Sequence, residues 1–147
     1  FARSRGAALA DLNLDGLLDL VVVTRREPVQ LWRNVGTGTA DTPEPMGRWL
    51  ALRLEQPAPN RDAVGARVRI EAGERVTSIE LTVGGGHASG QSGWLHVGLG
   101  EAESAEVTVT WPDGEVDAAV RVGADGFAII ERGADAPRAW SPDEVDE

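Results

Sequence analysis

The residues of this chain that are best suited to chemistry lie in one short stretch near its start. Oxygen-bearing side chains alternate there with leucines, and a glycine follows the third of them. Calcium is a hard cation that takes several oxygen ligands at once, so a short loop that binds it must direct many oxygens inward. Glycine permits the sharp turn that brings them together. The predicted calcium ligands are the side chains of Asp11, Asn13, Asp15 and Asp19 and the backbone carbonyl of Leu17.

This spacing matches only the first half of an EF-hand loop. An EF-hand closes with a glutamate at its twelfth position, and the residue there is Val22, inside an apolar run. We therefore expect the stretch to join two strands, over Ala7–Leu9 and Leu18–Val23. The plain alternative is an ordinary turn, because Asp, Asn and Gly are also common turn residues.

Composition narrows the classes of function. The chain has 147 residues and a net charge of −10, whereas nucleic-acid binding requires a basic face. It has no cysteine, which excludes disulfides, thiolate nucleophiles and zinc–thiolate sites. No apolar run reaches the roughly 18 residues of a membrane span. The abundance of Gly, Ala, Val and Arg and the absence of Lys indicate a GC-rich, bacterial coding sequence.

The first 36 residues resemble a known repeat. Arg5–Val22 looks like an FG-GAP/VCBS repeat, the calcium-binding blade of integrin-like β-propellers, and Leu31–Gly36 resembles the strand that ends such a blade. The resemblance implies the same four side chains as calcium ligands. One blade cannot bury both faces of its sheet alone. We therefore expect the rest of an upstream propeller as a partner, and we interpret the chain as the C-terminal piece of a longer protein.

The remainder of the chain predicts a second domain. Residues 37–47 are rich in Gly, Pro and Thr and are typical of a linker. Residues 48–132 alternate between apolar and polar side chains, which predicts an antiparallel β-sandwich. Residues 133–147 are polar and acidic, and we interpret them as a flexible tail. The expected sandwich strands are Trp49–Glu55, Ala66–Ala72, Arg75–Val83, Trp94–Leu99, Val107–Trp111, Val116–Val120 and Phe127–Glu131.

This second domain also resembles a family. Asn60–Val68, Gly84–Gly86, Leu95–Gly100 and Val109–Gly114 look like segments of the ASPIC/UnbV domain, which characteristically follows FG-GAP/VCBS repeats. Together the two resemblances cover most of the chain and imply a cartilage acidic protein-like architecture. The chain departs from the family after the glycines, where a tyrosine-containing Ser-Gln segment is usual.

That departing segment is the second candidate site. The loop Gly84–Gly93 holds His87, Ser89, Gln91 and Ser92 among glycines. Glycine lets a backbone approach a ligand closely, but it also simply makes loops, so a structural loop is the plain alternative. The pattern lacks the Lys and Ser/Thr of a phosphate-binding loop and the flanking glycines of a serine-hydrolase elbow.

The sequence as a whole predicts an all-β, calcium-binding and non-enzymatic interaction or adhesion module. Extracellular modules bind calcium at roughly 10⁻⁴ to 10⁻³ M, which favours a secreted or periplasmic location. A protein or a carbohydrate is the expected ligand, and an exposed tryptophan patch would support this class. The alternative is an accessory protein or enzyme of a biosynthetic pathway that uses the Gly84–Gly93 loop.

Overall fold

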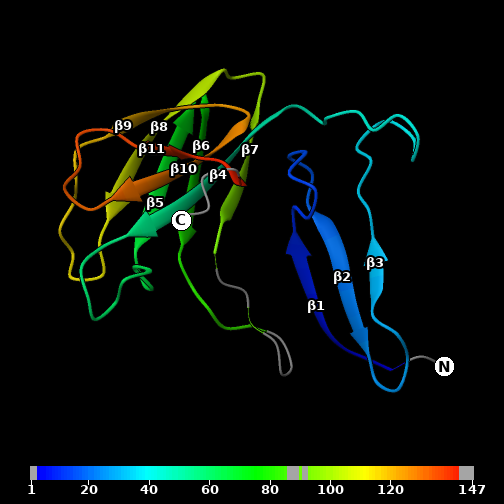
Figure 1. Cartoon of the computed structure of the whole chain (residues 1–147). Coiled ribbons are helices and arrows are strands. Elements are labelled where there is room, and N and C mark those ends of the chain that lie inside the picture. Colours follow the sequence, from blue (N-terminus) through cyan, green and yellow to red (C-terminus); the bar gives the residue numbers. More distant parts are fainter. Residues whose placement is uncertain (1–2, 86–89, 91–92, 143–147) are drawn as a thin grey trace. The chain divides into compact units, whose positions relative to one another are not determined.

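The computed structural model describes residues 3–85, 90 and 93–142. Its regular elements are eleven β-strands in three sheets, so the all-β prediction is confirmed. Within this described part, no helix is long and apolar enough to cross a membrane. The chain divides into two compact units, one with the described parts of Phe1–Met46 and Val83–Ser92, the other with those of Gly47–Thr82 and Gly93–Glu147 (Figure 1).

The first unit contains one three-stranded antiparallel sheet, which we call the N-terminal sheet. Its strands are β1 (Ser4–Ala10), β2 (Asp19–Thr24) and β3 (Gln30–Trp32), in the order β1-β2-β3. β-Branched residues favour the pleated conformation, and β2 carries three consecutive valines. The two strands expected on either side of the acidic stretch are therefore confirmed.

Both faces of the N-terminal sheet carry apolar side chains. Cross-strand partners share a face, and the register pairs Leu9 with Leu20 and Leu20 with Trp32 on one face. The opposite face carries Val21, which pairs with Leu31. Leu31 and Trp32 are 66% and 60% exposed. Among the described residues of this unit, Leu17 is the only apolar residue whose side chain is buried.

The segment that follows β3 is held by backbone hydrogen bonds. Residues 37–47, expected to be a linker, begin with a turn that folds back on Gly36: the Thr37 N–H donates to the Glu44 carbonyl at 3.2 Å. Gly36 has a φ of +61°, and a Cβ there would lie 1.8 Å from the Glu44 carbonyl oxygen. The close approach therefore requires glycine.

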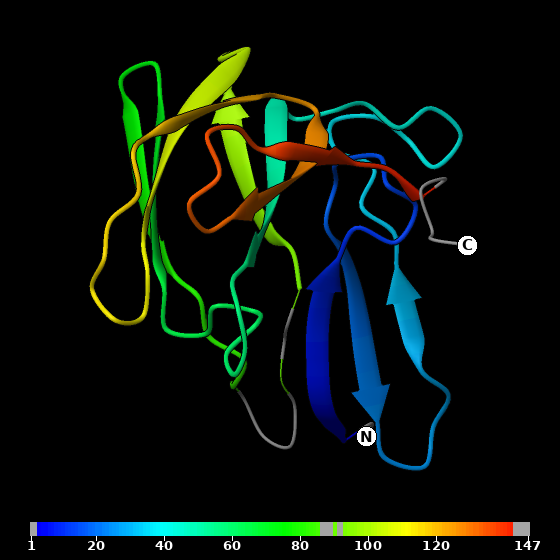
Figure 2. The same cartoon turned by 60° about the vertical axis from the view of Figure 1, so that its left-hand side comes forward.

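The second unit consists of two four-stranded sheets that share one hydrophobic core (Figures 1 and 2). The sheet orders are β11-β10-β4-β7 and β6-β5-β8-β9. The strands are β4 (Arg48–Glu55), β5 (Arg67–Ala72), β6 (Arg75–Glu80), β7 (Leu95–Gly100), β8 (Ser104–Thr110), β9 (Val120–Gly123), β10 (Gly126–Glu131) and β11 (Arg138–Trp140).

Apolar residues at every second position build this core. Leu50, Leu52 and Leu54 of β4 and Val68 and Ile70 of β5 belong to the same buried cluster. Each strand therefore presents one apolar face to the opposite sheet, which is the arrangement of a β-sandwich. The alternation seen in the sequence predicted these inner faces.

The expectation of a purely antiparallel sandwich is wrong for one pair of strands. β4 and β10 run parallel, with Leu50 opposite Gly126 and Glu55 opposite Glu131. A parallel pair requires a long crossover connection, and here nearly the whole unit lies between the two strands. Alternation defines which residues share a face of a strand but not the direction of its neighbour, so the sequence pattern could not reveal this pairing.

Two segments of the second unit differ from the expected elements. The strand expected over Val116–Val120 is β9, Val120–Gly123, and Val116 forms only an isolated bridge to Thr110. In the segment expected to be a flexible tail, Arg138–Trp140 forms β11 and pairs with β10. The side chain of Trp140 packs on Phe127, with ring centroids 5.4 Å apart, which gives this short strand an apolar contact.

Aromatic rings gather on the face of sheet β11-β10-β4-β7 that is opposite to the core. Trp49 stacks on His96 at 5.2 Å with an interplanar angle of 6°. Phe127 makes edge contacts with Trp49, Trp94 and Trp140. The rings therefore pack against one another.

An arginine ties the end of β10 to the turn after β8. The Arg132 guanidinium donates to Asp113 Oδ2 at 2.6 Å, to the Glu115 carboxylate and to Gln56 Oε1 at 3.2 Å. It also lies 5.5 Å from the centre of the Trp111 ring, within reach of a cation–π interaction. The hydrogen bond from Arg132, followed by that from the Glu115 N–H, lowers the pKa of the Asp113 carboxyl below its ordinary value.

Replacing Arg132 should therefore change the titration of its neighbour. A lowered folded-state pKa means that ionised Asp113 stabilises the fold above the ordinary carboxyl pKa, and that this contribution is lost as the pH falls through the folded-state value. In Arg132→Gln we expect the pKa of Asp113 to rise toward its ordinary value, as measured by NMR titration of its carboxyl carbon. Arg138→Gln, which removes a different arginine, should leave it unchanged. An unaltered Asp113 pKa in Arg132→Gln would contradict this account.

Shortening a core side chain should lower the free energy of unfolding strongly, whereas shortening an exposed side chain should change it little. Leu52 is 0% exposed and Val76 is 52% exposed. Leu52→Ala is expected to lower the free energy of unfolding by about 2–5 kcal/mol, because it removes buried methyl groups and leaves a cavity. Val76→Ala should cost less than about 1 kcal/mol. Urea unfolding of both variants measures the difference, and equal losses would be inconsistent with the observed core.

Candidate metal centre

The acidic stretch forms the loop between β1 and β2, which we call the acidic loop (residues 11–19). Ala10 and Asp19 are paired across the two strands at its base. Within the loop, Leu14 and Gly16 have positive φ angles of 61° and 85°. Glycine adopts such angles at no steric cost, so Gly16 turns the chain as the sequence predicted.

Asp11 closes the turn from its start. Its Oδ1 accepts the Asp15 N–H at 3.1 Å and its Oδ2 accepts the Gly16 N–H at 2.9 Å. Because this carboxylate accepts two backbone N–H groups of the same loop, it fixes the shape of the loop through contacts within the loop alone. The loop is thus held in shape by one of its own predicted ligands.

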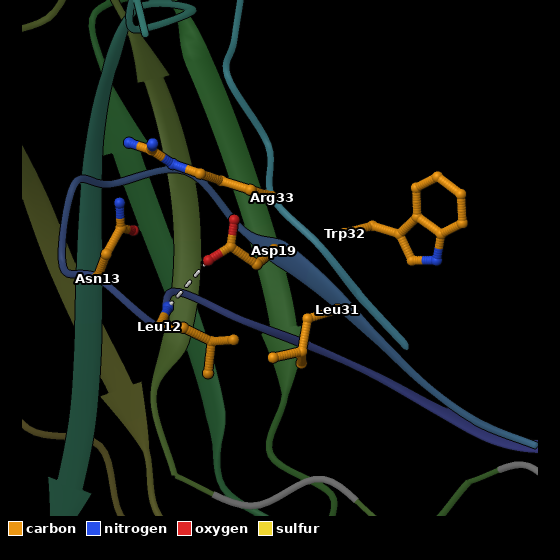
Figure 3. A pocket seen from close by; sticks show the side chains of 6 residues that line it. All are labelled: Leu12, Asn13, Asp19, Leu31, Trp32 and Arg33. Atoms are coloured by element: carbon orange, nitrogen blue, oxygen red, sulfur yellow. Dashed lines mark hydrogen bonds between the residues drawn. The ribbon is translucent and has the colours of Figure 1, made fainter. Parts of the chain in front are cut away.

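Asp19 connects the acidic loop to the end of β3. It is 4% exposed, and its Oδ2 accepts the Leu12 N–H at 3.3 Å, drawn as a dashed line in Figure 3. Its Oδ1 accepts the Asn34 N–H at 2.8 Å. Burying a charged group is tolerated when it is hydrogen-bonded, and these two donors meet that condition.

Asp15 lies on the more exposed side of the loop. Its Oδ1 accepts the Leu17 N–H at 2.9 Å, and its Oδ2 accepts the Asn13 amide at 2.7 Å. The Arg33 guanidinium lies 3.7 Å from the same Oδ2. Asp15 therefore carries three partners, one of which is charged.

A shallow hollow of about 440 Å³ lies beside the acidic loop. Figure 3 shows that its lining comes from the loop, from the start of β2 and from the end of β3. Two of the predicted ligands are part of this lining. The residues are Leu12, Asn13, Asp19, Leu31, Trp32 and Arg33.

The chemistry of these donors fits a hard cation. The loop offers three carboxylates, one amide oxygen and one backbone carbonyl, all of them oxygen ligands. Within the described part of the chain, no three His, Cys, Asp or Glu side chains already form a metal-holding group, and the loop carboxylates are directed at N–H donors instead. Each carboxylate oxygen has two lone pairs, so a single N–H leaves it able to accept a further partner.

Two residues of this region were not singled out by the sequence. Arg33 and Asn34 follow β3, and the pairing of β2 with β3 brings them to the loop. Asn34 also donates from its side chain to the Leu18 carbonyl at 3.3 Å. The polar pair after Trp32 is a weak signal in the sequence, because nothing there indicates which loop it reaches.

The second predicted site was the Gly84–Gly93 loop. His87, Ser89, Gln91 and Ser92 all lie outside the described residues. The other histidine, His96, is in β7 and stacks on Trp49.

The fold and the comparisons together define the class. A two-sheet unit follows a small antiparallel sheet with an acidic loop. A family model described as ASPIC and UnbV matches residues 56–137, which is more than half of the chain. The chain therefore belongs to the ASPIC and UnbV family. The comparison with curated proteins gave no match.

Removing Asp19 should loosen the connection between the acidic loop and β3. Asp19→Ala leaves the Leu12 and Asn34 N–H groups without their acceptor, at a local cost of about 1–3 kcal/mol. We expect faster hydrogen exchange at the amides of these two residues, measured by NMR, and unchanged exchange in β4. Asp41→Ala, which removes an exposed carboxylate outside the loop, should change neither region. Full protection of the Asn34 amide in Asp19→Ala would exclude the proposed connection.

Proposed function

We propose that this protein is a calcium-binding, non-enzymatic interaction module that acts outside the cytoplasm, in the extracellular space or the periplasm. The observation that carries the proposal is the acidic loop, in which Asp11, Asn13, Asp15 and Asp19 lie on one hairpin connection together with the Leu17 carbonyl. These five groups are the proposed calcium ligands.

The folded state of the loop supports this assignment. Its carboxylates are held by the N–H groups of Leu12, Asp15, Gly16 and Leu17, so calcium would not have to order the whole loop when it binds. Ordering a flexible segment on binding lowers affinity. In this proposal calcium has a structural role and stiffens the end of the N-terminal sheet.

The apolar faces of the N-terminal sheet support the interaction part of the proposal. Leu9, Leu20 and Trp32 on one face and Leu31 on the other are exposed. A sheet whose two faces are both apolar is ordinarily covered on both sides. We propose that this sheet is an FG-GAP/VCBS-type blade and that the rest of an upstream propeller covers it, as in a cartilage acidic protein-like architecture.

The location follows from the proposed ion. Extracellular calcium-binding modules work at roughly 10⁻⁴ to 10⁻³ M calcium, and we expect the acidic loop to bind calcium in that range. A protein or carbohydrate ligand would be bound in addition to the propeller. The pathway-enzyme alternative depends on the Gly84–Gly93 loop, most of which lies outside the described residues.

Calcium should therefore stabilise the protein through Asp15. At about 10 mM calcium a site in this affinity range adds roughly 1.4–2.7 kcal/mol by mass action. We expect saturable binding in an isothermal titration of the chelator-treated chain, with a rise in melting temperature. Asp15→Ala should bind more weakly and lose the dependence of its melting temperature on calcium.

A matched variant separates the loop from general charge effects. Asp41→Ala also removes one carboxylate, but from an exposed position outside the acidic loop, and it should keep the full response to calcium. If the melting curves of the unmodified chain coincide in calcium and in chelator, the calcium function is disproved.

A further inference from the structure

A positively charged side chain lies beside one of the proposed cation ligands. The Arg33 Nη2 is 3.7 Å from Asp15 Oδ2, with the Arg33 side chain 49% exposed and that of Asp15 27% exposed. The same Asp15 oxygen accepts the Asn13 amide. Without a metal ion, the charge of this carboxylate is therefore offset by groups of the chain itself.

The position of Arg33 is fixed by the fold. It follows the last residue of β3, and the pairing of Trp32 with Leu20 places the next residue beside the end of the acidic loop. The following residue, Asn34, is anchored through its N–H to Asp19 at 2.8 Å. The backbone of Arg33 is thus held between a strand pair and a backbone hydrogen bond, and from there its side chain reaches Asp15.

Arg33 also lines the hollow beside the acidic loop. The polar lining of this hollow consists of Asn13, Asp19 and Arg33 (Figure 3). Two of these three residues are proposed calcium ligands.

We propose that Arg33 is an internal counter-ion that lowers the affinity of the acidic loop for calcium. This inference rests on the calcium-binding function proposed above. A divalent cation bound by Asp15 would face a like charge across a few ångströms and would have to displace it. For partly exposed charges the effect is modest, and we expect it to change affinity by about two- to fivefold. Arg33 is therefore a residue that sets affinity without being a ligand.

The test compares four forms of the full chain by isothermal titration with calcium chloride after chelator treatment, at low ionic strength. Arg33→Gln removes the charge and should bind calcium about two- to fivefold more tightly than the unmodified chain. Arg33→Lys keeps the charge and should bind like the unmodified chain. Arg53→Gln removes an arginine that pairs with Glu55 at 3.4 Å in the second unit and should have no effect. The gain in Arg33→Gln should shrink as salt is added, because salt screens exposed charges.

The outcomes separate this inference from the function on which it rests. If the unmodified chain binds calcium and Arg33→Gln binds equally or more weakly, the counter-ion role is overturned and the calcium site stands. If Arg33→Lys gains as much affinity as Arg33→Gln, the effect comes from side-chain shape and the counter-ion role again fails. If none of the four forms binds calcium, the calcium function is disproved, and the inference falls with it.

Discussion

The burial of apolar side chains between two four-stranded sheets is the interaction on which the second unit depends. Leucines of β4 and valines of β5 and β8 form one cluster, and Trp111 lies within it almost fully buried. Neither sheet could keep its apolar face in water alone. Because β4 opens this unit and pairs with β10 near its end, the core is completed only when distant parts of the chain meet.

The N-terminal sheet is held together in a different way. Its strands pair through the backbone, and the carboxylates of Asp11 and Asp19 accept N–H groups from the acidic loop and from Asn34, the second residue after β3. These hydrogen bonds fix the shape of the loop but bury little apolar surface. The apolar side chains on both faces of the sheet thus stay exposed and could be covered by another surface. The polar contacts that fix the loop also bring together the oxygens of the proposed calcium site. Structure and proposed function therefore share the same few carboxylates.

Sequence periodicity was informative where a strand has one buried face. It predicted β4, β5, β7 and β10 closely, and the Asp-Gly spacing located the acidic loop between two strands. It failed for β11, where Arg138–Trp140 lies in a polar segment and gains its stability from pairing with β10 and from the Trp140–Phe127 contact. It also missed Arg33 and Asn34, since their contacts with Asp15 and Asp19 join residues 15 or more positions apart.

By itself, the sequence determined the all-β class, the inner faces of the sandwich strands, the acidic loop and the chemical nature of its oxygen donors, because alternation and turn residues act locally along the chain. The motifs of the second domain also indicated the ASPIC/UnbV family, which the family match supports. Only the tertiary structure decided that β4 and β10 run parallel, that β11 adds to the same sheet, and that Arg33 lies beside Asp15. Strand pairing is a hydrogen-bonding relation between segments far apart in the chain. A pattern that assigns a residue to one face of its own strand carries no information on which strand will lie next to it.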